Sequence, residues 1–347
     1  MNIMAAATAV STATLQLDYL SSEQIASQSP AWWKSVLGIV GFEKAPAIEA
    51  VRIPVAASMT PALGATDICE VWRVAAAHVR LSSGETRQGH VRYRYCDDLL
   101  FGSLTIAEQR DEDEARALLR ATETAYREIF DVLNRTEHRH LIRIWNYLPD
   151  INREIGGDER YRLFNSARQL AFRNSGRATT GAVPAACALG SPAGSPISIY
   201  FLAARNPPKM IENPRQTSAY HYPPKFGKHR PIFSRACVWG EPGSARLFVS
   251  GTASIVGHET IHLGDVAAQT RETMVNIGAL LDEANRVVGS ARYSTAGLKL
   301  KVYVRREEDL PAIRAALSLT LSPAAHVLYL QADVCREDLL VEIEAVG

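Results

Sequence analysis

The second half of the chain alternates short apolar runs with longer amphipathic segments. Apolar runs bounded by Gly, Pro and polar residues predict β-strands, and segments with apolar residues every three or four positions predict helices. The expected strands cover residues 197–205, 231–239, 246–254, 298–305, 326–332 and 340–347, and the expected helices cover residues 265–288 and 308–319. This order of elements predicts a fold that mixes strands and helices.

The first half repeats this order. A hairpin is expected from Glu70 to Tyr95 with its turn at residues 82–84, followed by a strand at 99–107, a helix at 111–133, a strand at 141–147 and a helix at 158–172. The sequence LFGSLT at 100–105 is similar to LFVSGT at 247–252, and each precedes an Ala-rich amphipathic helix. We interpret the match as a diverged duplication, joined by the Gly-, Ala-, Ser- and Pro-rich residues 174–195.

The final strand contains two acids in an otherwise apolar sequence. Strand alternation places Glu342 and Glu344 on one face, opposite Val341, Ile343 and Ala345. At least one carboxylate is therefore expected to point inward. An unpaired ionised carboxylate is costly to bury, so an inward Glu needs cationic partners or stays protonated, and a protonated Glu is a candidate proton donor. The alternative is a solvated strand edge.

Composition limits the classes of function. Of the 347 residues, 47% are hydrophobic and 22% are charged, and the net charge of +1 provides no extended field for binding nucleic acid or an anionic membrane. No apolar run has the length of a transmembrane helix. The five cysteines are far apart and form no CxxC pair, which favours the reducing cytoplasm. Residues 1–15 lack the features of a signal peptide and are expected to form a loose tail.

One motif matches a metal site. HETIH at 258–262 has the HExxH pattern of zinc proteases, with Glu283 at the spacing of a third ligand. That chemistry needs both imidazoles on one face of a helix. Gly257 and Gly264 flank the motif, and Asp265 is a good N-cap for the helix that follows, so the motif is predicted to lie in a loop. No GxGxxG or GxxxxGK[ST] pattern indicates a nucleotide cofactor either.

Cations and tyrosines are concentrated in a proline-rich segment, residues 204–235. Arginine binds carboxylates in a bidentate manner, and tyrosine hydroxyls add directional hydrogen bonds. The prolines lower the entropy cost of holding these side chains in place. This segment therefore suits a small dianionic ligand, with a solvated surface loop as the alternative.

Two sets of segments resemble known families. Residues 247–253, the helix with Gln269-Thr270-Arg271 and Asn276-Ile277, residues 301–304 and residues 341–345 are similar to the RidA (YjgF) proteins. A longer run resembles the chorismatases: residues 143–152, Arg160-Tyr161, Phe164-Asn165, 203–207, 213–216 and 220–222, and from there to the C-terminus. This second resemblance covers well over half of the chain in one order.

The resemblance implies an α+β fold of two RidA-like domains, each a mixed β-sheet with helices packed on one face. Residues 1–180 would form a degenerate N-terminal domain, and residues 181–347 a C-terminal domain that carries most of the active site. Chorismatases use no metal or organic cofactor and cleave the enolpyruvyl ether of chorismate, a small-molecule substrate, to release pyruvate. Their catalytic acid is a C-terminal Glu, whose position is that of Glu342. Protonation of the vinyl ether carbon needs an acid that is still protonated near neutral pH, and an inward Glu supplies one.

The ring product depends on other positions. Chorismatases either hydrolyse chorismate to a dihydroxycyclohexadiene carboxylate or convert it to 3-hydroxybenzoate, and one branch also yields 4-hydroxybenzoate. The hydroxybenzoate-forming members carry a Cys seven residues before the catalytic Glu, which is the place of Cys335, so 3-hydroxybenzoate is expected here. A small buried hydrophobe is the alternative role for Cys335. A second product determinant is expected between Gly251 and Ser254.

Six further residues are expected to meet the two carboxylates and the hydroxyl of the substrate: Arg205, Arg215, Gln216, Tyr220, Arg235 and Arg305. Arg305 ends a strand expected beside the terminal strand and is a candidate to hold deprotonated Glu342. Three alternative functions are an enamine or imine hydrolase like the single-domain RidA proteins, a pteridine-dependent oxygenase, and a non-enzymatic ligand-binding protein. A monomer is expected, because a duplicated chain builds internally the interface that RidA trimers build between subunits.

Overall fold

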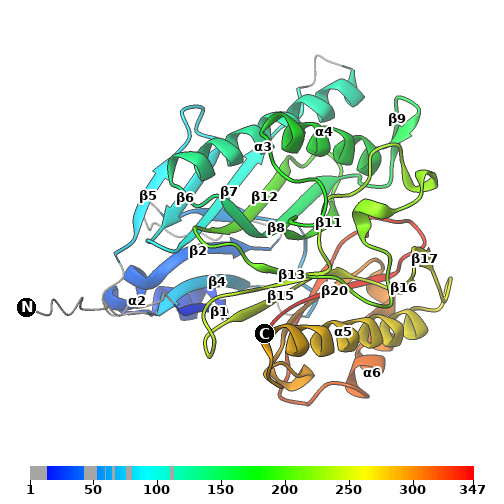
Figure 1. Ribbon diagram of the computed structural model, residues 1–347. Helices are drawn as coiled ribbons and strands as arrows, with labels where there is room; N and C mark the ends of the chain where they lie inside the picture. The colour runs from blue at the N-terminus through cyan, green and yellow to red at the C-terminus, as the bar shows by residue number, and fades with distance from the viewer. Residues whose placement is uncertain (1–13, 43–52, 59, 65–66, 76–79, 110–112) are drawn as a thin grey trace, which may run out of the picture.

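A computed structural model describes residues 14–42, 53–58, 60–64, 67–75, 80–109 and 113–347, and within these residues two six-stranded sheets lie between two layers of helices (Figure 1). Helices α3 (Glu114–Arg135) and α4 (Arg160–Asn174) cover the outer face of the first sheet, and α5 (Val266–Val288) and α6 (Leu310–Ser318) cover that of the second. Aromatic side chains of both sheets, among them Trp145, Tyr200, Phe248 and Tyr303, share one buried cluster. The inner faces of the sheets therefore pack on each other.

The two sheets have the same topology. The first contains β5 (Ser82–Glu85), β6 (Val91–Tyr95), β7 (Leu99–Ile106), β8 (His140–Pro149), β11 (Ala185–Ser191) and β12 (Ile197–Ala204), in the order β11-β8-β12-β7-β6-β5. The second contains β13 (Lys209–Ile211), β14 (Ala236–Trp239), β15 (Arg246–Thr252), β18 (Lys299–Val304), β19 (His326–Gln331) and β20 (Val341–Val346), in the order β19-β18-β20-β15-β14-β13. In the first sheet, the edge strand β11 runs parallel to β8, and β12 is antiparallel to both β8 and β7. In the second sheet, the edge strand β19 runs parallel to β18, and β20 is antiparallel to both β18 and β15. This confirms the α+β class, with two mixed sheets of matching topology that each have helices on one face, as expected for two RidA-like domains.

Strand β11 lies inside the segment that we predicted to be a junction, and that prediction is wrong for residues 185–191. All seven residues of β11 are buried, so the strand shows no alternation of polar and apolar positions from which it could be recognised. Strands β11 and β12 both belong to the first sheet. The domain boundary between residues 180 and 181 stays a prediction, and sheet membership favours a division between Ala204 and Lys209.

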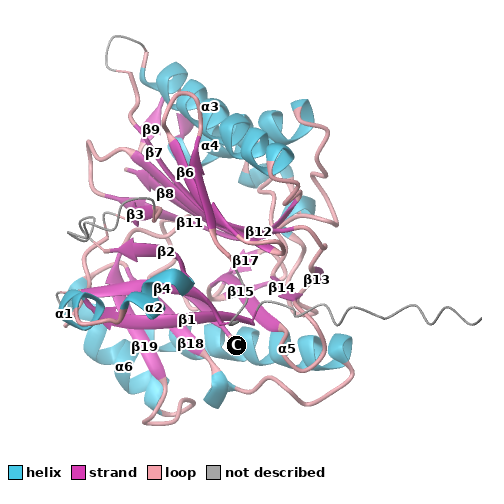
Figure 2. Cartoon of the chain, turned by 90° about the vertical axis from the view of Figure 1, so that its left-hand side faces the viewer, coloured by secondary structure: helices cyan, strands magenta, loops and turns pink. Residues whose placement is uncertain are grey.

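A third sheet, which the sequence patterns did not reveal, lies beside the two larger ones (Figure 2). Its order is β1 (Thr14–Ser21), β4 (Ile68–Ala75), β2 (Val36–Gly41) and β3 (Val55–Ala57), and the short helices α1 (Ser22–Ala26) and α2 (Pro30–Ser35) join β1 to β2. Leu15 of β1 and Trp72 of β4 are buried in the cluster between the large sheets. Of the predicted N-terminal tail, residues 1–13 lie outside the described residues, whereas Thr14 and Leu15 belong to this sheet.

This third sheet also corrects the hairpin predicted from Glu70 to Tyr95. Strand β4 pairs with β1 and β2, while β5 pairs with β6 across a turn at residues 86–90. Residues 76–79, which follow β4 in the sequence and precede β5, lie outside the described residues. The predicted turn at residues 82–84 is instead part of β5, because apolar alternation identifies strands but not their partners.

The sequence signals for helix ends were more reliable than those for strand pairing. The Asp265 side chain caps α5 by accepting a hydrogen bond of 2.9 Å from the Ala268 amide, and the helix ends at Gly289, whose φ of 71° is in the left-handed region. The Asp113 side chain caps α3 in the same way. None of the helices in the described residues is long and apolar enough to cross a membrane.

Candidate functional site

The terminal strand β20 lies inside its sheet, between β15 and β18, so the two acids do not lie on a solvated strand edge. Val341, Ile343 and Ala345 pack in the core that α5 and α6 cover. Glu342 and Glu344 point the other way, toward the first sheet, and each is only 3% exposed. The predicted alternation is therefore confirmed, and both carboxyl groups are inward.

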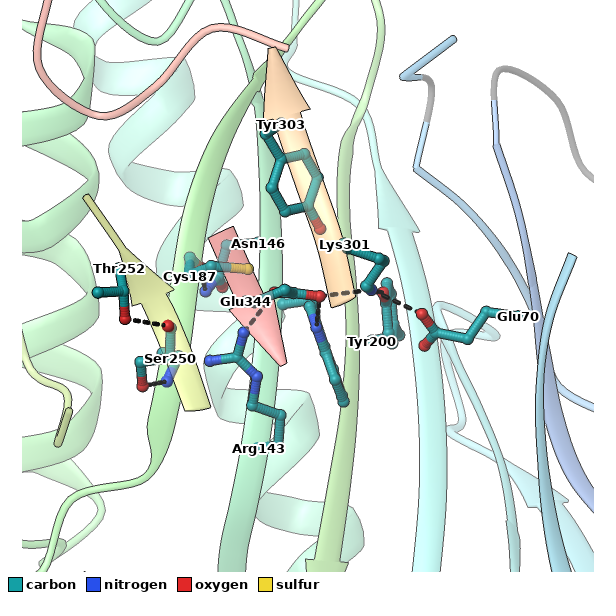
Figure 3. A network of polar contacts seen from close by, with 12 residues as sticks. Glu70, Arg143, Asn146, Cys187, Tyr200, Ser250, Thr252, Lys301, Tyr303 and Glu344 are labelled. Carbon is teal, nitrogen blue, oxygen red and sulfur yellow. Dashed lines mark hydrogen bonds and ion pairs between the residues drawn. The ribbon is translucent and has the colours of Figure 1, made fainter. Parts of the chain in front are cut away.

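Glu344 is held by three donors in a buried polar network (Figure 3). Its Oε1 atom accepts hydrogen bonds from Trp145 Nε1 at 2.8 Å and from Lys301 Nζ at 2.6 Å, and its Oε2 atom pairs with the Arg143 guanidinium. Although burial raises the pKa of this carboxyl, the charges of Lys301 and Arg143 outweigh it and lower the pKa below its ordinary value. Glu344 is therefore an anion at neutral pH.

Glu342 has the opposite environment. Its Oε1 atom is buried and has no hydrogen-bond partner within the described part of the chain. Burial, followed by the repulsion of Glu344, raises the pKa of Glu342 from 4.5 to about 8, although the charges of Arg143, Arg235 and Arg305 oppose the shift. Glu342 therefore carries a proton at neutral pH, which is the state required of a general acid.

Glu342 lines a cavity of about 450 Å³ between the two large sheets. The residues around it come from the connection between β8 and α4, the first turn of α4, the segment before β14, the end of β15 and the residues after it, the connection between β19 and β20, and β20 itself. Those used below are Asn152, Glu154, Glu159, Tyr161, Arg162, Tyr222, Phe226, Phe233, Arg235, Gly251, Cys335, Arg336, Glu337, Asp338 and Glu342. Three of the residues predicted from the sequence, Glu342, Cys335 and Arg235, thus meet at one cavity.

Gly251 leaves the space that the Glu342 carboxyl occupies. A Cβ atom at this position would lie 2.0 Å from Glu342 Oε1 and 2.6 Å from its Cδ. It would also lie 3.1 Å from the Cβ of Cys187. Any larger side chain must therefore displace the acid. This places one residue of the predicted 251–254 segment against Glu342.

Two cations at the cavity, buried Arg235 and half-buried Arg336, have unused donors. Arg235 donates through Nη2 to Thr217 O at 2.6 Å and to the Tyr222 hydroxyl at 2.7 Å, while its Nε has no partner in the described residues. Arg336 donates through Nη1 to His258 O at 2.9 Å, and its buried Nη2 likewise has no partner there. Its guanidinium lies 4.1 Å from the centroid of the Phe226 ring. Unpaired buried donors on cations favour an anionic ligand.

Cys335 lines the cavity as a neutral thiol. Burial, followed by the proximity of Glu342, raises its pKa to about 12, so it is not a thiolate nucleophile at neutral pH. Its apolar neighbours are Ala253, Ile255 and Leu339. The thiol therefore shapes the cavity and remains uncharged.

Arg305 fixes the wall of the cavity but does not line it. Its guanidinium donates to the carbonyls of Leu339, Val334 and Arg336, and to the side chains of Asn152 and Asp333. It ties the connection between β19 and β20, which carries Cys335 and Arg336, to the connection after β8. The prediction that Arg305 contacts the substrate has no support from this arrangement.

The other four predicted binding residues also lie outside the cavity lining. The Arg215 side chain bonds to Asn276 and Glu272, and the Gln216 amide donates to Ile255 O at 3.0 Å. The Tyr220 hydroxyl donates to Glu212, and Arg205 pairs with Glu137 at 3.7 Å. These contacts are within the protein, because Arg and Tyr in a Pro-rich loop serve equally to hold the loop in place. Their binding roles stay predictions without geometric support.

The lining residues that we did not predict include four aromatic side chains and Arg336, together with four acids: Tyr161, Tyr222, Phe226, Phe233, Arg336, Glu154, Glu159, Glu337 and Asp338. Tyr161 and Tyr222 lie in the segments that resemble the chorismatases, and Phe226 and Phe233 lie in the cationic segment. Arg336 follows Cys335 directly. The segments that contribute to the cavity could therefore be predicted from the sequence, but the sequence did not reveal which of their side chains point into it.

As we predicted, the HETIH motif does not lie on a helix. It follows β16 (Ile255–Val256), contains β17 (Glu259–Thr260), and leaves His262 with a φ of 59°. His258 lies 3.0 Å from Glu259, whereas His262 lies 3.7 Å from Glu272. The two imidazoles thus have separate partners, and no group of three or more His, Cys, Asp or Glu among the described residues could hold a metal ion.

Comparisons with known proteins agree on one family. The family model "Chorismatase FkbO/Hyg5-like, N-terminal" matches residues 70–203. A 3-hydroxybenzoate synthase of Streptomyces hygroscopicus is 42% identical over 65% of this chain and 68% of its own length. A chorismatase of Streptomyces rapamycinicus is 38% identical over 72% and 74%, respectively. A crystal structure of a chorismatase superposes with a TM-score of 0.83 at 32% identity and covers 96% of this chain and 99% of that one.

Proposed function

The chain belongs to the chorismatase family, and we propose that it cleaves the enolpyruvyl ether of chorismate to pyruvate and 3-hydroxybenzoate, with Glu342 as the general acid. The observation that carries the proposal is the buried Glu342 carboxyl at the cavity, whose Oε1 has no hydrogen-bond partner in the described residues. A pKa of about 8 suits an acid that must donate a proton near neutral pH.

The chemistry needs one proton donor and one proton acceptor. Glu342 protonates the methylene carbon of the enolpyruvyl group, and positive charge develops at the ether carbon. The bond between ring C3 and the ether oxygen breaks, and the group leaves as pyruvate. Loss of the C4 proton would then give 4-hydroxybenzoate, whereas 3-hydroxybenzoate requires the C4 hydroxyl oxygen to bond to C3 as pyruvate leaves, its bond to C4 to break, and the ring to lose the C3 proton as it becomes aromatic. Chorismate then divides into pyruvate and hydroxybenzoate with no water consumed, and the ring proton can restore Glu342. The hydrolytic branch differs because it consumes one water.

The cavity suits a small dianion with a ring. Its volume of about 450 Å³ lies within the range of small-molecule sites. Arg235 and Arg336 offer unpaired donors for the two carboxylates, and Tyr161, Phe226 and Phe233 provide apolar surface for the ring. Arg235 favours the ionised form of Glu342, and the negative charge of a bound substrate would offset this effect.

Two observations favour the hydroxybenzoate branch. One relative carries the name 3-hydroxybenzoate synthase. In this chain the cavity wall beside Glu342 is formed in part by the neutral Cys335 thiol and by Gly251. We infer that these two residues influence which ring product forms, including the share of 4-hydroxybenzoate.

The test is to incubate the purified protein with chorismate, quantify pyruvate, and identify the ring product against 3-hydroxybenzoate, 4-hydroxybenzoate and the dihydrodiol acid. We expect equal amounts of pyruvate and 3-hydroxybenzoate, and a matched Glu342→Gln variant that releases neither. The dihydrodiol acid would replace the proposed branch with hydrolysis. If wild-type protein releases no pyruvate, the proposed reaction is wrong.

A further inference from the structure

We propose that Glu344 is a positioning residue for this reaction: Arg143 and Lys301 hold it as a carboxylate, and its fixed negative charge keeps the proton on Glu342 until substrate accepts it. The proposal rests on Glu342 being the general acid, and it adds the group that maintains the acid in its working state. Glu344 itself does not line the cavity.

The geometry of β20 brings the two acids together. They are separated by one residue on the same face of a strand, which is about 7 Å along the chain. Both are buried, so water screens their repulsion poorly. Only one of the two has cationic hydrogen-bond partners, namely Glu344. The strand therefore holds one carboxylate and one carboxylic acid side by side, as in other pairs of neighbouring acids.

The charge on Glu344 is balanced by cations from two different domains. Arg143 comes from β8 of the first sheet, and Lys301 comes from β18 of the second (Figure 3). Lys301 also lies 2.6 Å from Glu70 of β4, whose Oε1 accepts from Trp72 Nε1 at 2.6 Å. Burial raises the pKa of Glu70, and the charge of Lys301 opposes the rise. With Glu70 ionised, two buried carboxylates and two buried cations form a neutral set. The N-terminal sheet contributes to it through Glu70, although it adds no residue to the cavity lining.

The remaining groups that face Glu342 do not supply a comparable negative charge. Arg143 on β8, Arg235 before β14 and Arg305 after β18 are cations and favour its ionised form. Burial raises the pKa values of the neighbouring Cys187, Cys335 and Tyr303, which stay neutral near pH 7. Burial also raises the pKa of Glu159 across the cavity, and the other acids of the lining, Glu154, Glu337 and Asp338, are exposed to solvent, which screens their charges. Glu159 pairs with Arg162 at 3.5 Å but is only partly buried, so Glu344 is the one fully buried carboxyl among these groups that ion pairs fix.

A purely structural role for Glu344 predicts a different result from the one proposed. Removing a structural ion pair would lower stability and the amount of folded enzyme, but the pH at which Glu342 loses its proton would not move. If Glu344 maintains that proton, its removal leaves Arg143 without its anion, while Lys301 keeps Glu70. Glu342 then loses the repulsion of Glu344 and keeps the attraction of Arg143. The pKa of Glu342 must then fall.

The first readout is the pH dependence of kcat/KM for pyruvate release, which reports the free enzyme. Activity of the wild type should fall as pH rises through about 8, because Glu342 deprotonates there. In Glu344→Gln the fall should occur at least about one pH unit lower. A fall at the wild-type pH would overturn the proposal.

Two double variants keep the test decisive if Glu344→Gln does not fold. Glu344→Gln with Lys301→Met removes one anion and one cation, so the buried set stays neutral, and the same downward shift is expected. Glu70→Gln with Lys301→Met also preserves neutrality but keeps the Glu344–Arg143 pair, so its profile should stay within about half a pH unit of wild type. Equal profiles in the two double variants would contradict the proposal.

A second readout does not depend on turnover. Infrared difference spectra record the carbonyl band of a protonated carboxylic acid, which disappears as the acid ionises, and Glu342→Gln identifies the band. We expect this titration to move to lower pH in Glu344→Gln without any substrate present. A protein that releases no pyruvate contradicts the proposed function, whereas an unmoved titration contradicts the role of Glu344.

Discussion

Replacing Glu342 by Gln should stabilise the protein while it removes the activity. Burial first, and Glu344 second, raise the pKa of Glu342 from 4.5 to about 8, so the folded protein holds a proton that the unfolded chain releases. The free energy of unfolding of the wild type must therefore fall as pH rises between these two values, because the folded state binds more protons there. Gln has the shape of the protonated acid but does not titrate, so the variant lacks this pH-dependent cost.

The size of the effect follows from the two pKa values. One pKa unit corresponds to about 1.4 kcal/mol. Proton linkage then makes Glu342→Gln more stable than wild type by about 1 kcal/mol at pH 5 and by about 4 kcal/mol at pH 8, with no difference well below pH 4.5. All other titrating groups are common to both proteins, so their contributions largely cancel in the comparison. Loss of a general acid should lower kcat by about 100- to 10,000-fold.

The assay is urea unfolding of both proteins at several pH values between 5 and 8, followed by fluorescence and circular dichroism, because coincident transitions justify a two-state analysis. The expected signature is a difference in unfolding free energy that grows with pH. Wild type and variant with the same pH dependence would refute the raised pKa, and turnover by the variant at the wild-type rate would refute the role of Glu342 as acid.

Three further substitutions probe the cavity. Gly251→Ala should lower kcat about 100-fold, because the new Cβ displaces the Glu342 carboxyl, and a wild-type rate would show that the acid has room to move. Cys335→Ala should keep pyruvate release but alter the proportion of ring products measured by chromatography; an unchanged proportion would remove Cys335 from product control. Arg336→Met should raise KM about 10- to 100-fold through loss of a charged donor. Arg162→Met, a control at a half-exposed cation of the same cavity that already pairs with Asp158 and Glu159, should change KM little; equal effects would contradict the assignment.

Most of the repeated fold could be predicted from periodicity and capping. The expected and observed bounds of α5 differ by one residue at its start, because Asp265 is a local capping signal. Strand β20 was expected from alternation alone, and both faces are as predicted. Strand β11 was not recognised, since a strand of mostly small residues that is buried on both faces shows no alternation of polar and apolar positions. The third sheet was missed because strand pairing over fifty residues leaves no short-range trace, as the pairing of Asp18 with Val71 illustrates.

The candidate site could be predicted only in part. Glu342 was identified as a candidate acid because a Glu inside an apolar strand must have cationic partners, keep its proton or reach solvent. Arg235 and Cys335 meet it at the cavity, whereas Arg205, Arg215 and the other predicted binding residues have partners within the protein. An arginine in a loop looks the same in sequence whether it binds a ligand or a neighbouring carboxylate, since both use the same donors.

The sequence by itself therefore determined which residues can be buried together on β20 and which face they share, because strand alternation is a local property of the backbone. The tertiary structure alone decided their protonation. Glu342 and Glu344 are the same residue type on the same face, yet the second is paired with Arg143 and Lys301 and the first is not. Those cations lie 201 and 43 positions away in the chain, so the electrostatic difference between the two acids arises only when the two sheets pack together.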